Sequence, residues 1–294
     1  MPGKSLIILH PSTLQLLRFH FSFFLMPVFW FALSQLVFIS SIRSVLVFVI
    51  LHLLVYPASN GYNSFMDRDT ESIGGIKKPL QPTQQLLYAT ILFDILAIVL
   101  SSFISLYFTL GIIAYILASK AYSYRGIRLK KYPIAGYLTV VIFQGAFTFA
   151  LVYHGCSLNK TLDIPLLPMI VASLLIGGFY PLTQIYQHEA DAKDGVKSLS
   201  YILGYRGTFL YCGIVYALAF TLLAFYFIYS LKSDAFYIFT LGMSPVVIYF
   251  LVWAFKVWYN SSKANYINTM RMNVVASVCS NITFITIFLR NYFE

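Results

Sequence analysis

Long apolar segments alternate with short polar ones along nearly the whole chain. Each apolar segment approaches the roughly 20 residues that an α-helix needs to cross a hydrocarbon core of about 30 Å. Helix is the favoured spanning structure because it satisfies every backbone amide within its own segment. The pattern therefore predicts an all-α, polytopic membrane protein, a bundle of nine transmembrane helices that forms a single domain over residues 1–294. The predicted spans are 19–39, 44–62, 84–104, 107–121, 134–153, 166–185, 208–228, 235–258 and 273–290.

One boundary in this pattern depends on a short interruption. The segment "SSFISLYFTLGI" must form a tight hairpin if the apolar stretch from Leu86 to Ala121 is to make two spans. The distribution of basic residues supports the split, because merging the two spans would move the cluster from Lys120 to Lys131 to the opposite face of the membrane.

Composition and charge agree with this topology. Hydrophobic residues make up 59% of the chain and charged residues only 10%, against roughly a quarter charged in soluble domains. With nine spans and the N-terminus inside, 16 of the 20 basic residues lie on the inner face, as the positive-inside rule expects. The net charge of +10 thus follows from topology and gives no reason to expect a nucleic-acid partner. We expect a multi-pass protein of a bacterial inner membrane, with its N-terminus and its acidic motifs on the cytoplasmic side.

Polar residues at helical spacing follow the second span. Asn63, Asp67 and Glu71 stand at positions i, i+4 and i+8, so they share one face if the helix continues beyond the bilayer. Asp69 points elsewhere on such a helix.

A second polar row follows the sixth span. Gln187, Asp191 and Asp194 stand at i, i+4 and i+7, and Gln184 extends the row by one turn. Two opposed rows of oxygen ligands suit Mg²⁺, which binds substrate phosphates through one or two carboxylates. The alternative is that these are solvated loop carboxylates paired with nearby lysines; two rows on one membrane face favour a site.

Basic residues lie near both rows. Lys78 follows the first row, and Arg128 and Lys130 lie in the inner loop between spans four and five. Diphosphate recognition needs cations besides metal, and Arg and Lys supply them. Ordinary anchoring at the inner face explains these cations equally well.

The segment "NSFMDRDTE", followed by "KKPL", resembles the first motif of the UbiA superfamily of intramembrane prenyltransferases. That motif reads Asn-x-x-x-Asp-x-x-x-Asp, with a basic residue and a proline shortly afterwards. Asn63 and Asp67 match it, Glu71 replaces its last aspartate, and Lys78 with Pro79 stands where Arg-Pro is usual.

Two further segments extend the resemblance. "YSYRGIRLKKYP" is similar to the family's Tyr-Ser-x-x-Pro-x-Arg-Leu-Lys segment but lacks the proline. "YQHEADAKDGVKS" resembles the second aspartate-rich motif, with Gln187 in place of the leading aspartate. An amide oxygen brings no negative charge, so we expect weaker metal affinity at the second row. The matching residues are Tyr122, Ser123, Arg128, Leu129, Lys130, Asp191, Gly195, Lys197 and Ser198.

The resemblance implies a central cavity opening to the inner face and a Mg²⁺-dependent prenyltransferase. Such an enzyme ionises an isoprenyl diphosphate and transfers the prenyl group to an acceptor, a small molecule or lipid such as an aromatic quinone precursor. It implies Asp67 and Asp191 as catalytic residues. It implies metal ligands at Asn63, Asp67, Glu71, Gln187, Asp191 and Asp194, and substrate contacts at Asn63, Lys78, Tyr122, Arg128, Lys130, Gln187, Lys197 and, for the acceptor, Arg18.

Two other functions stay open at this stage. A terpene cyclase of the same superfamily would use the same ionisation and let the cation cyclise within its own chain. A membrane transporter or lipid-binding protein would need polar groups along its spans, and Asp94 is the single acidic residue within them.

Overall fold

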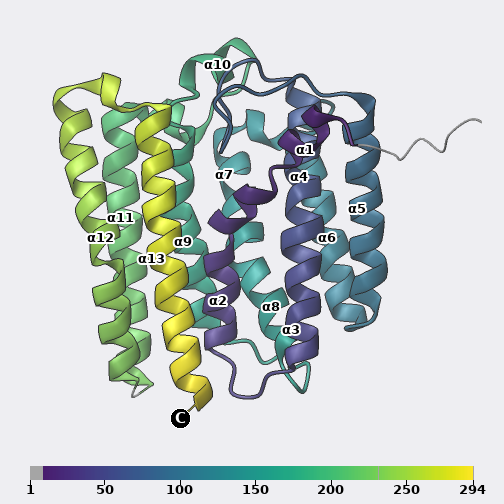
Figure 1. Cartoon of the computed structure of the whole chain (residues 1–294). Coiled ribbons are helices and arrows are strands. Elements are labelled where there is room, and N and C mark those ends of the chain that lie inside the picture. Colours follow the sequence, from purple (N-terminus) through teal and green to yellow (C-terminus); the bar gives the residue numbers. More distant parts are fainter. Residues whose placement is uncertain (1–8, 231, 294) are drawn as a thin grey trace, which may run out of the picture.

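The computed structural model describes residues 9–230 and 232–293, where all regular elements are helices apart from two isolated β-bridges. The helices stand side by side as a bundle (Figure 1). They are α1 (Pro11–Leu17), α2 (Met26–Ser34), α3 (Ser41–Phe48), α4 (Tyr56–Asp67), α5 (Gln84–Ser102), α6 (Leu106–Ser123), α7 (Pro133–Val141), α8 (Thr148–Cys156), α9 (Leu166–Gln184), α10 (His188–Lys193), α11 (Leu199–Tyr229), α12 (Ser233–Tyr259) and α13 (Tyr266–Phe293). Short 3₁₀ turns cover Phe19–Phe24, Leu129–Lys131 and Ser261–Lys263, and π-helical turns cover Val49–Val55 and Ile142–Phe147.

Nine helical segments of the described chain are long and apolar enough to cross a bilayer. Three of them are composite: α1 with α2, α3 with α4, and α7 with α8. The predicted hairpin is also present, because α5 ends at Ser102 and the Ser105 hydroxyl caps α6 by accepting from the backbone N–H of Phe108 at 3.0 Å. The prediction of an all-α, polytopic membrane protein with nine spans is confirmed.

Predicted and observed spans differ most where helices meet polar loops. The first predicted span, 19–39, corresponds to Pro11–Ser34, which is broken at Arg18 in a left-handed conformation (φ 49°). The seventh and ninth, 208–228 and 273–290, start earlier, at Leu199 and Tyr266. Hydropathy locates the part of a helix inside hydrocarbon, whereas the helix itself can continue into water.

The polar motifs gather at one end of the bundle, which we call the α10 end. Helices α1 and α10 and the loops after α4 and α6 lie there, at the top of Figure 1, and α13 ends at the opposite side. The loops that carry the two acidic motifs and the basic segment therefore share one face, as the span count predicts.

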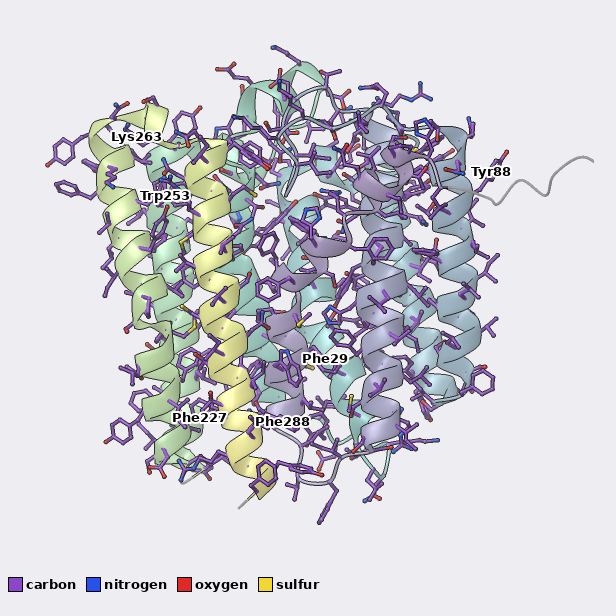
Figure 2. All side chains as sticks on the ribbon, viewed as in Figure 1. Phe29, Tyr88, Phe227, Trp253, Lys263 and Phe288 are labelled. Carbon is purple, nitrogen blue, oxygen red and sulfur yellow. The ribbon has the colours of Figure 1, made fainter. Side chains whose placement is uncertain are left out.

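The outer surface of the bundle is apolar. Tyr88, at the edge of the bundle in Figure 2, is 67% exposed, and many large apolar side chains point outward in the same way. Near the α10 end the indole N–H of Trp253 donates to the carbonyl of Lys263 at 2.9 Å. An apolar belt on a bundle of this length is the surface that lipid tails cover.

Asp94, the single acidic residue within the predicted spans, pairs with a neighbouring helix. Its Oδ2 lies 2.7 Å from Nζ of Lys120 on α6, and the same ammonium sits over the Tyr62 ring at 4.0 Å from its centroid. Both charged side chains are largely withdrawn from solvent, at 12% and 23% exposed. The pair links α5 to α6 and gives Asp94 a structural role.

We expect Asp94→Leu to destabilise the protein by about 1–3 kcal/mol, because the Lys120 ammonium is left without its counter-charge. The double variant Asp94→Leu/Lys120→Leu should recover most of the loss, since removing both partners leaves no unpaired charge. Thermal unfolding in detergent measures both. Equal destabilisation by the single and the double change would contradict this account of the pair.

Candidate functional site

A polar cavity of about 220 Å³ lies at the α10 end of the bundle. Asn63 and Asp67 reach it from α4, Tyr122 reaches it from α6, and Gln187 and Asp191 reach it from the start and middle of α10. Side chains from α9, α13 and the π-helical turn after α7 complete its walls. The fold thus brings the two predicted acidic motifs to one cavity.

Basic residues of the loop after α6 connect the two acidic motifs. Lys130 Nζ donates to Asp67 Oδ2. Arg128 pairs through Nη2 with Asp194 Oδ2 and lies 3.6 Å from Asp67 Oδ1, and its Nη1 donates to the Asp194 carbonyl at 3.0 Å. Arg125 adds a longer contact to Asp194, at 3.4 Å. Residues from three separate motifs therefore form one charged cluster.

The carboxylates of this cavity are held close together and away from water. Burial raises the pKa of Asp69 to about 6, and the neighbouring Asp67 adds to the rise. Burial likewise raises the pKa of Asp191 to about 7, where Lys130 opposes the rise and Asp69 and Asp67 add to it. At Asp194 burial is outweighed by the Arg128 guanidinium, which lowers the pKa. Additional positive charge near Asp69 and Asp191 would stabilise their ionised forms.

The residues present fit a magnesium ion that is held partly by its substrate. In the described part of the chain no three carboxylate, imidazole or thiolate groups form a metal site by themselves. Mg²⁺ is ordinarily bound through one or two carboxylates, phosphate oxygens and water. Asp67 Oδ1 is buried without a hydrogen-bond donor, and Asp69 and Asp191 line the same cavity. These three carboxylates could hold Mg²⁺ together with a diphosphate.

Neutral polar groups form a second layer in the cavity wall. Asn63 Nδ2 donates to the Ser123 hydroxyl at 3.1 Å, which ties α4 to α6. The hydroxyls of Tyr122 and Tyr180 are hydrogen-bonded, and Gln184 Nε2 donates to Tyr180 at 3.0 Å. This chain of contacts fixes Tyr122 against α9 at the edge of the charged cluster.

The expectation of one continuous helical face after the second span is wrong. Helix α4 ends at Asp67 because Arg68 adopts a left-handed conformation (φ 54°) that cannot continue the helix. Glu71 therefore lies in the following loop, outside the cavity, with its side chain 60% exposed and 3.8 Å from Lys193. Asp69, which the helical spacing directed away, lines the cavity instead.

The second row is also not a single helical face. Helix α9 ends at Gln184, and α10 is a separate helix that begins at His188. Gln187 and Asp191 nevertheless both line the cavity, because the backbone N–H of Asp191 donates to the Gln187 carbonyl at 2.8 Å across the first turn of α10. Asp194 ends α10 and is held by arginines, which leaves it among ion pairs rather than on the cavity wall.

The predicted cations divide into two groups. Arg18 and Lys130 line the cavity, and Arg128 contacts one of its aspartates, Asp67. Lys78 and Lys197 are exposed and do not line it. Lys197 follows the lining residue Val196, and Lys78 lies four residues after the lining residue Gly74. Their positions in the motifs therefore place both residues near the cavity but do not determine where their side chains point.

Sequence reasoning missed several lining residues that lie deeper in the membrane. Asn60 and Asn273 belong to the cavity wall although no motif contains them. Asn60 stands one helical turn before Asn63, so the polar face of α4 was already visible in the spacing. Asn273, at the start of the ninth predicted span, gave no signal beyond an amide inside an apolar segment.

The nine apolar spans and the polar cavity define a multi-pass helical membrane protein with a buried, charged site at one end. A profile of the UbiA prenyltransferase family matches residues 24–275. The chain therefore belongs to the UbiA prenyltransferase family.

Solved structures share this fold at low sequence identity. A UbiA homologue from Archaeoglobus fulgidus, bound to DMAPP and Mg²⁺, is 19% identical with a TM-score of 0.67, covering 94% of this chain and 99% of that one. An apo UbiA homologue from Aeropyrum pernix K1 is 17% identical with a TM-score of 0.69, covering 92% and 98%. A digeranylgeranylglyceryl phosphate synthase is 17% identical with a TM-score of 0.60, covering 96% and 98%. No curated protein sequence matches the chain.

Proposed function

We propose that this protein is a Mg²⁺-dependent prenyltransferase that ionises an isoprenyl diphosphate in the cavity at the α10 end. The observation that carries the proposal is the charged cluster, in which Lys130 and Arg128 contact Asp67 and Arg128 also contacts Asp194. Buried carboxylates and cations in one cavity can bind a metal and a polyanion together. Family membership and the relatives solved with Mg²⁺ and DMAPP or GPP support the same function.

The reaction breaks the bond between C1 of the allylic group and the diphosphate oxygen. When bound, Mg²⁺ would neutralise the diphosphate and act as a Lewis acid on its oxygens. Lys130 and Arg128 would stabilise the charge that develops on the leaving pyrophosphate. Asp67, Asp69 and Asp191 would hold the metal and orient the diphosphate against these cations.

The deeper walls of the cavity suit an allylic cation. Tyr115, Phe143 and Tyr180 line it below the charged cluster, and aromatic faces attract positive charge. Burial among helices keeps water, a competing nucleophile, away from C1. An acceptor bound beside the allylic group would then capture the cation.

Release of pyrophosphate from an isoprenyl diphosphate, dependent on Mg²⁺, is the test of this function. Product analysis with and without an aromatic acceptor distinguishes a prenyltransferase from a terpene cyclase. A prenylated acceptor supports transfer, and a cyclic hydrocarbon formed without acceptor supports a cyclase. No pyrophosphate from prenyl diphosphates of several lengths would contradict the proposal.

We also propose that the α10 end faces the cytoplasm of a bacterial inner membrane, which accessibility labelling of Lys197 in intact cells would test.

Gln187 offers a separate prediction on metal affinity. Gln187→Asp should tighten the apparent Mg²⁺ affinity about tenfold, because added ligand charge strengthens binding of a hard divalent cation. Gln187→Asn is the matched control, since it has the size of Asp without the charge and should not tighten binding. The Mg²⁺ dependence of pyrophosphate release measures both. Equal affinities for the two variants would remove position 187 from the metal ligands that the family resemblance implies.

A further inference from the structure

Several buried polar atoms in the cavity wall have no hydrogen-bond partner among the described residues. Asn273 Oδ1 and Gln184 Oε1 are unpaired acceptors, and Asn60 Nδ2 is an unpaired donor. Asn273 is only 1% exposed. An unpaired buried polar atom costs about 1–3 kcal/mol, so these three are complementary to a ligand that both donates and accepts hydrogen bonds.

Asn60 and Asn273 lie deeper in the bundle than the charged cluster, whereas Gln184 ends α9 beside it. Asn60 precedes Asp67 by seven residues on α4, which is about 10 Å along the helix. Arg18 lies near them, and its terminal nitrogens already donate to the backbone carbonyls of Asn60, at 3.2 Å, and Gly74, at 3.4 Å. The two terminal nitrogens of Arg18 are therefore occupied by backbone carbonyls. Its Nε is a further buried donor without a partner, so the unpaired groups here are three side-chain amides and one guanidinium N–H.

A separate apolar cavity of about 70 Å³ lies beyond Asn273 along α13. Ile176 and Phe179 of α9 and Ala276 and Ser277 of α13 line it. Ser277 stands one helical turn beyond Asn273 on the same face of α13.

The two cavities are also adjacent at the turn before α2. Phe21 lines the polar cavity and Phe24 lines the apolar one, and their rings are in edge contact with centroids 5.2 Å apart. The apolar cavity is larger than the roughly 10–15 Å³ that one water-sized probe occupies, and its walls offer little to a polar ligand.

We propose that these two features together form the acceptor subsite, and that the acceptor is an amphiphile with a neutral hydroxyl head and an apolar tail. The head would lie between Asn60, Gln184 and Asn273, and the tail would enter the apolar cavity between α2, α9 and α13. The inference rests on the proposed prenyl transfer and adds the chemical class of its second substrate.

The transfer step balances with groups already described. The C1–oxygen bond breaks and its electron pair leaves with pyrophosphate, while a lone pair of the acceptor hydroxyl forms the new bond to C1. The hydroxyl proton passes to a pyrophosphate oxygen. Before the reaction, one of the two amide oxygens, Asn273 Oδ1 or Gln184 Oε1, would accept the single hydrogen bond that the hydroxyl can donate. The proton then moves to pyrophosphate, so these amides act as positioning groups rather than as bases.

Matched acceptors test this proposal on the full chain purified in detergent with Mg²⁺ and an isoprenyl diphosphate. We expect kcat/KM for prenylation of 4-dodecylphenol to exceed that for phenol and for 4-hydroxybenzoate at least tenfold. Equal or better use of phenol or 4-hydroxybenzoate would overturn the inference, and pyrophosphate release from the wild type would show that the proposed function survives. Absence of any pyrophosphate release would overturn both.

Substitutions at Asn273 and at Ala276 test separately where the head and the tail of the acceptor bind. Asn273→Leu should lower the amount of prenylated 4-dodecylphenol formed per pyrophosphate released at least tenfold, and Asn273→Ser should restore part of it.

Ala276→Phe, which fills the apolar cavity, should reduce the preference for 4-dodecylphenol over phenol at least tenfold. Val278→Phe is the control, because Val278 lies on the lipid-facing side of the same helix and is 38% exposed. An unchanged preference in Ala276→Phe would overturn the tail assignment.

Discussion

Replacing Asp67 by Asn is expected to lower Mg²⁺-dependent pyrophosphate release at least about 100-fold, the size of effect seen when a preorganised electrostatic contact is removed. Asp67 is the one carboxylate that contacts Lys130 and lies 3.6 Å from Arg128 while also lining the cavity. The amide keeps the size of the side chain but loses the charge that pairs with Lys130 and Arg128 and that would hold the metal in the proposed mechanism. Asp191→Asn should give a loss of similar size, because Asp191 faces the same space from α10.

Initial rates of pyrophosphate release at saturating Mg²⁺ measure both variants. Asp163→Asn is the control, since Asp163 is an exposed residue in the loop before α9 and does not line the cavity. Its rate should equal that of the wild type. Wild-type rates in both Asp67→Asn and Asp191→Asn, with the proteins folded by size-exclusion chromatography, would show that the chemistry occurs elsewhere.

Removing the cation that contacts Asp67 is expected to have the next largest effect. Lys130→Met should lower pyrophosphate release about 10- to 100-fold, because the proposed mechanism gives Lys130 the role of stabilising the leaving pyrophosphate. The neighbouring Lys131 is exposed and lines no cavity, so Lys131→Met is a closely matched control and should keep the wild-type rate.

The substrate dependence of Lys130→Met distinguishes catalysis from folding. A cation acting on the departing pyrophosphate should mainly affect kcat, whereas a loss of folded protein would lower the apparent enzyme concentration seen by active-site titration. Equal rates for Lys130→Met and Lys131→Met would place the diphosphate away from the loop after α6.

The hydropathy and charge of the sequence are sufficient to predict the architecture. Nine spans, the hairpin between Ser102 and Leu106 and the common face of the polar loops all follow from where hydrocarbon can cover the chain. Asn63 and Asp67 could be placed on one face because both lie inside α4, where helical spacing holds.

The sequence could not show where helices end in the polar loops. Arg68 takes a left-handed conformation that ends α4. Asp69 therefore lines the cavity and Glu71 lies outside it, the reverse of what a continuing helix predicts. No glycine marks this end, so the spacing alone favoured a longer helix. The same limit applies to α10, where the break after Gln184 turns one expected stripe into two separate elements.

Contacts between distant loops were equally hidden. Lys130 and Asp67 are 63 residues apart, and Arg128 and Asp194 are 66 residues apart. Each motif on its own was compatible with a solvated, positively charged loop. Only the contacts of the loop after α6 with Asp67 at the end of α4 and with Asp194 after α10 show that the three motifs form one charged cluster.

The most direct measurement is a structure of the protein with Mn²⁺ and a thiolo-diphosphate analogue of an isoprenyl diphosphate, with the metal located by anomalous scattering. The account predicts Mn²⁺ within about 2.5 Å of carboxylate oxygens from Asp67 and Asp191, with the diphosphate between it and Lys130. Metal and diphosphate bound together at any place that touches neither aspartate would contradict it.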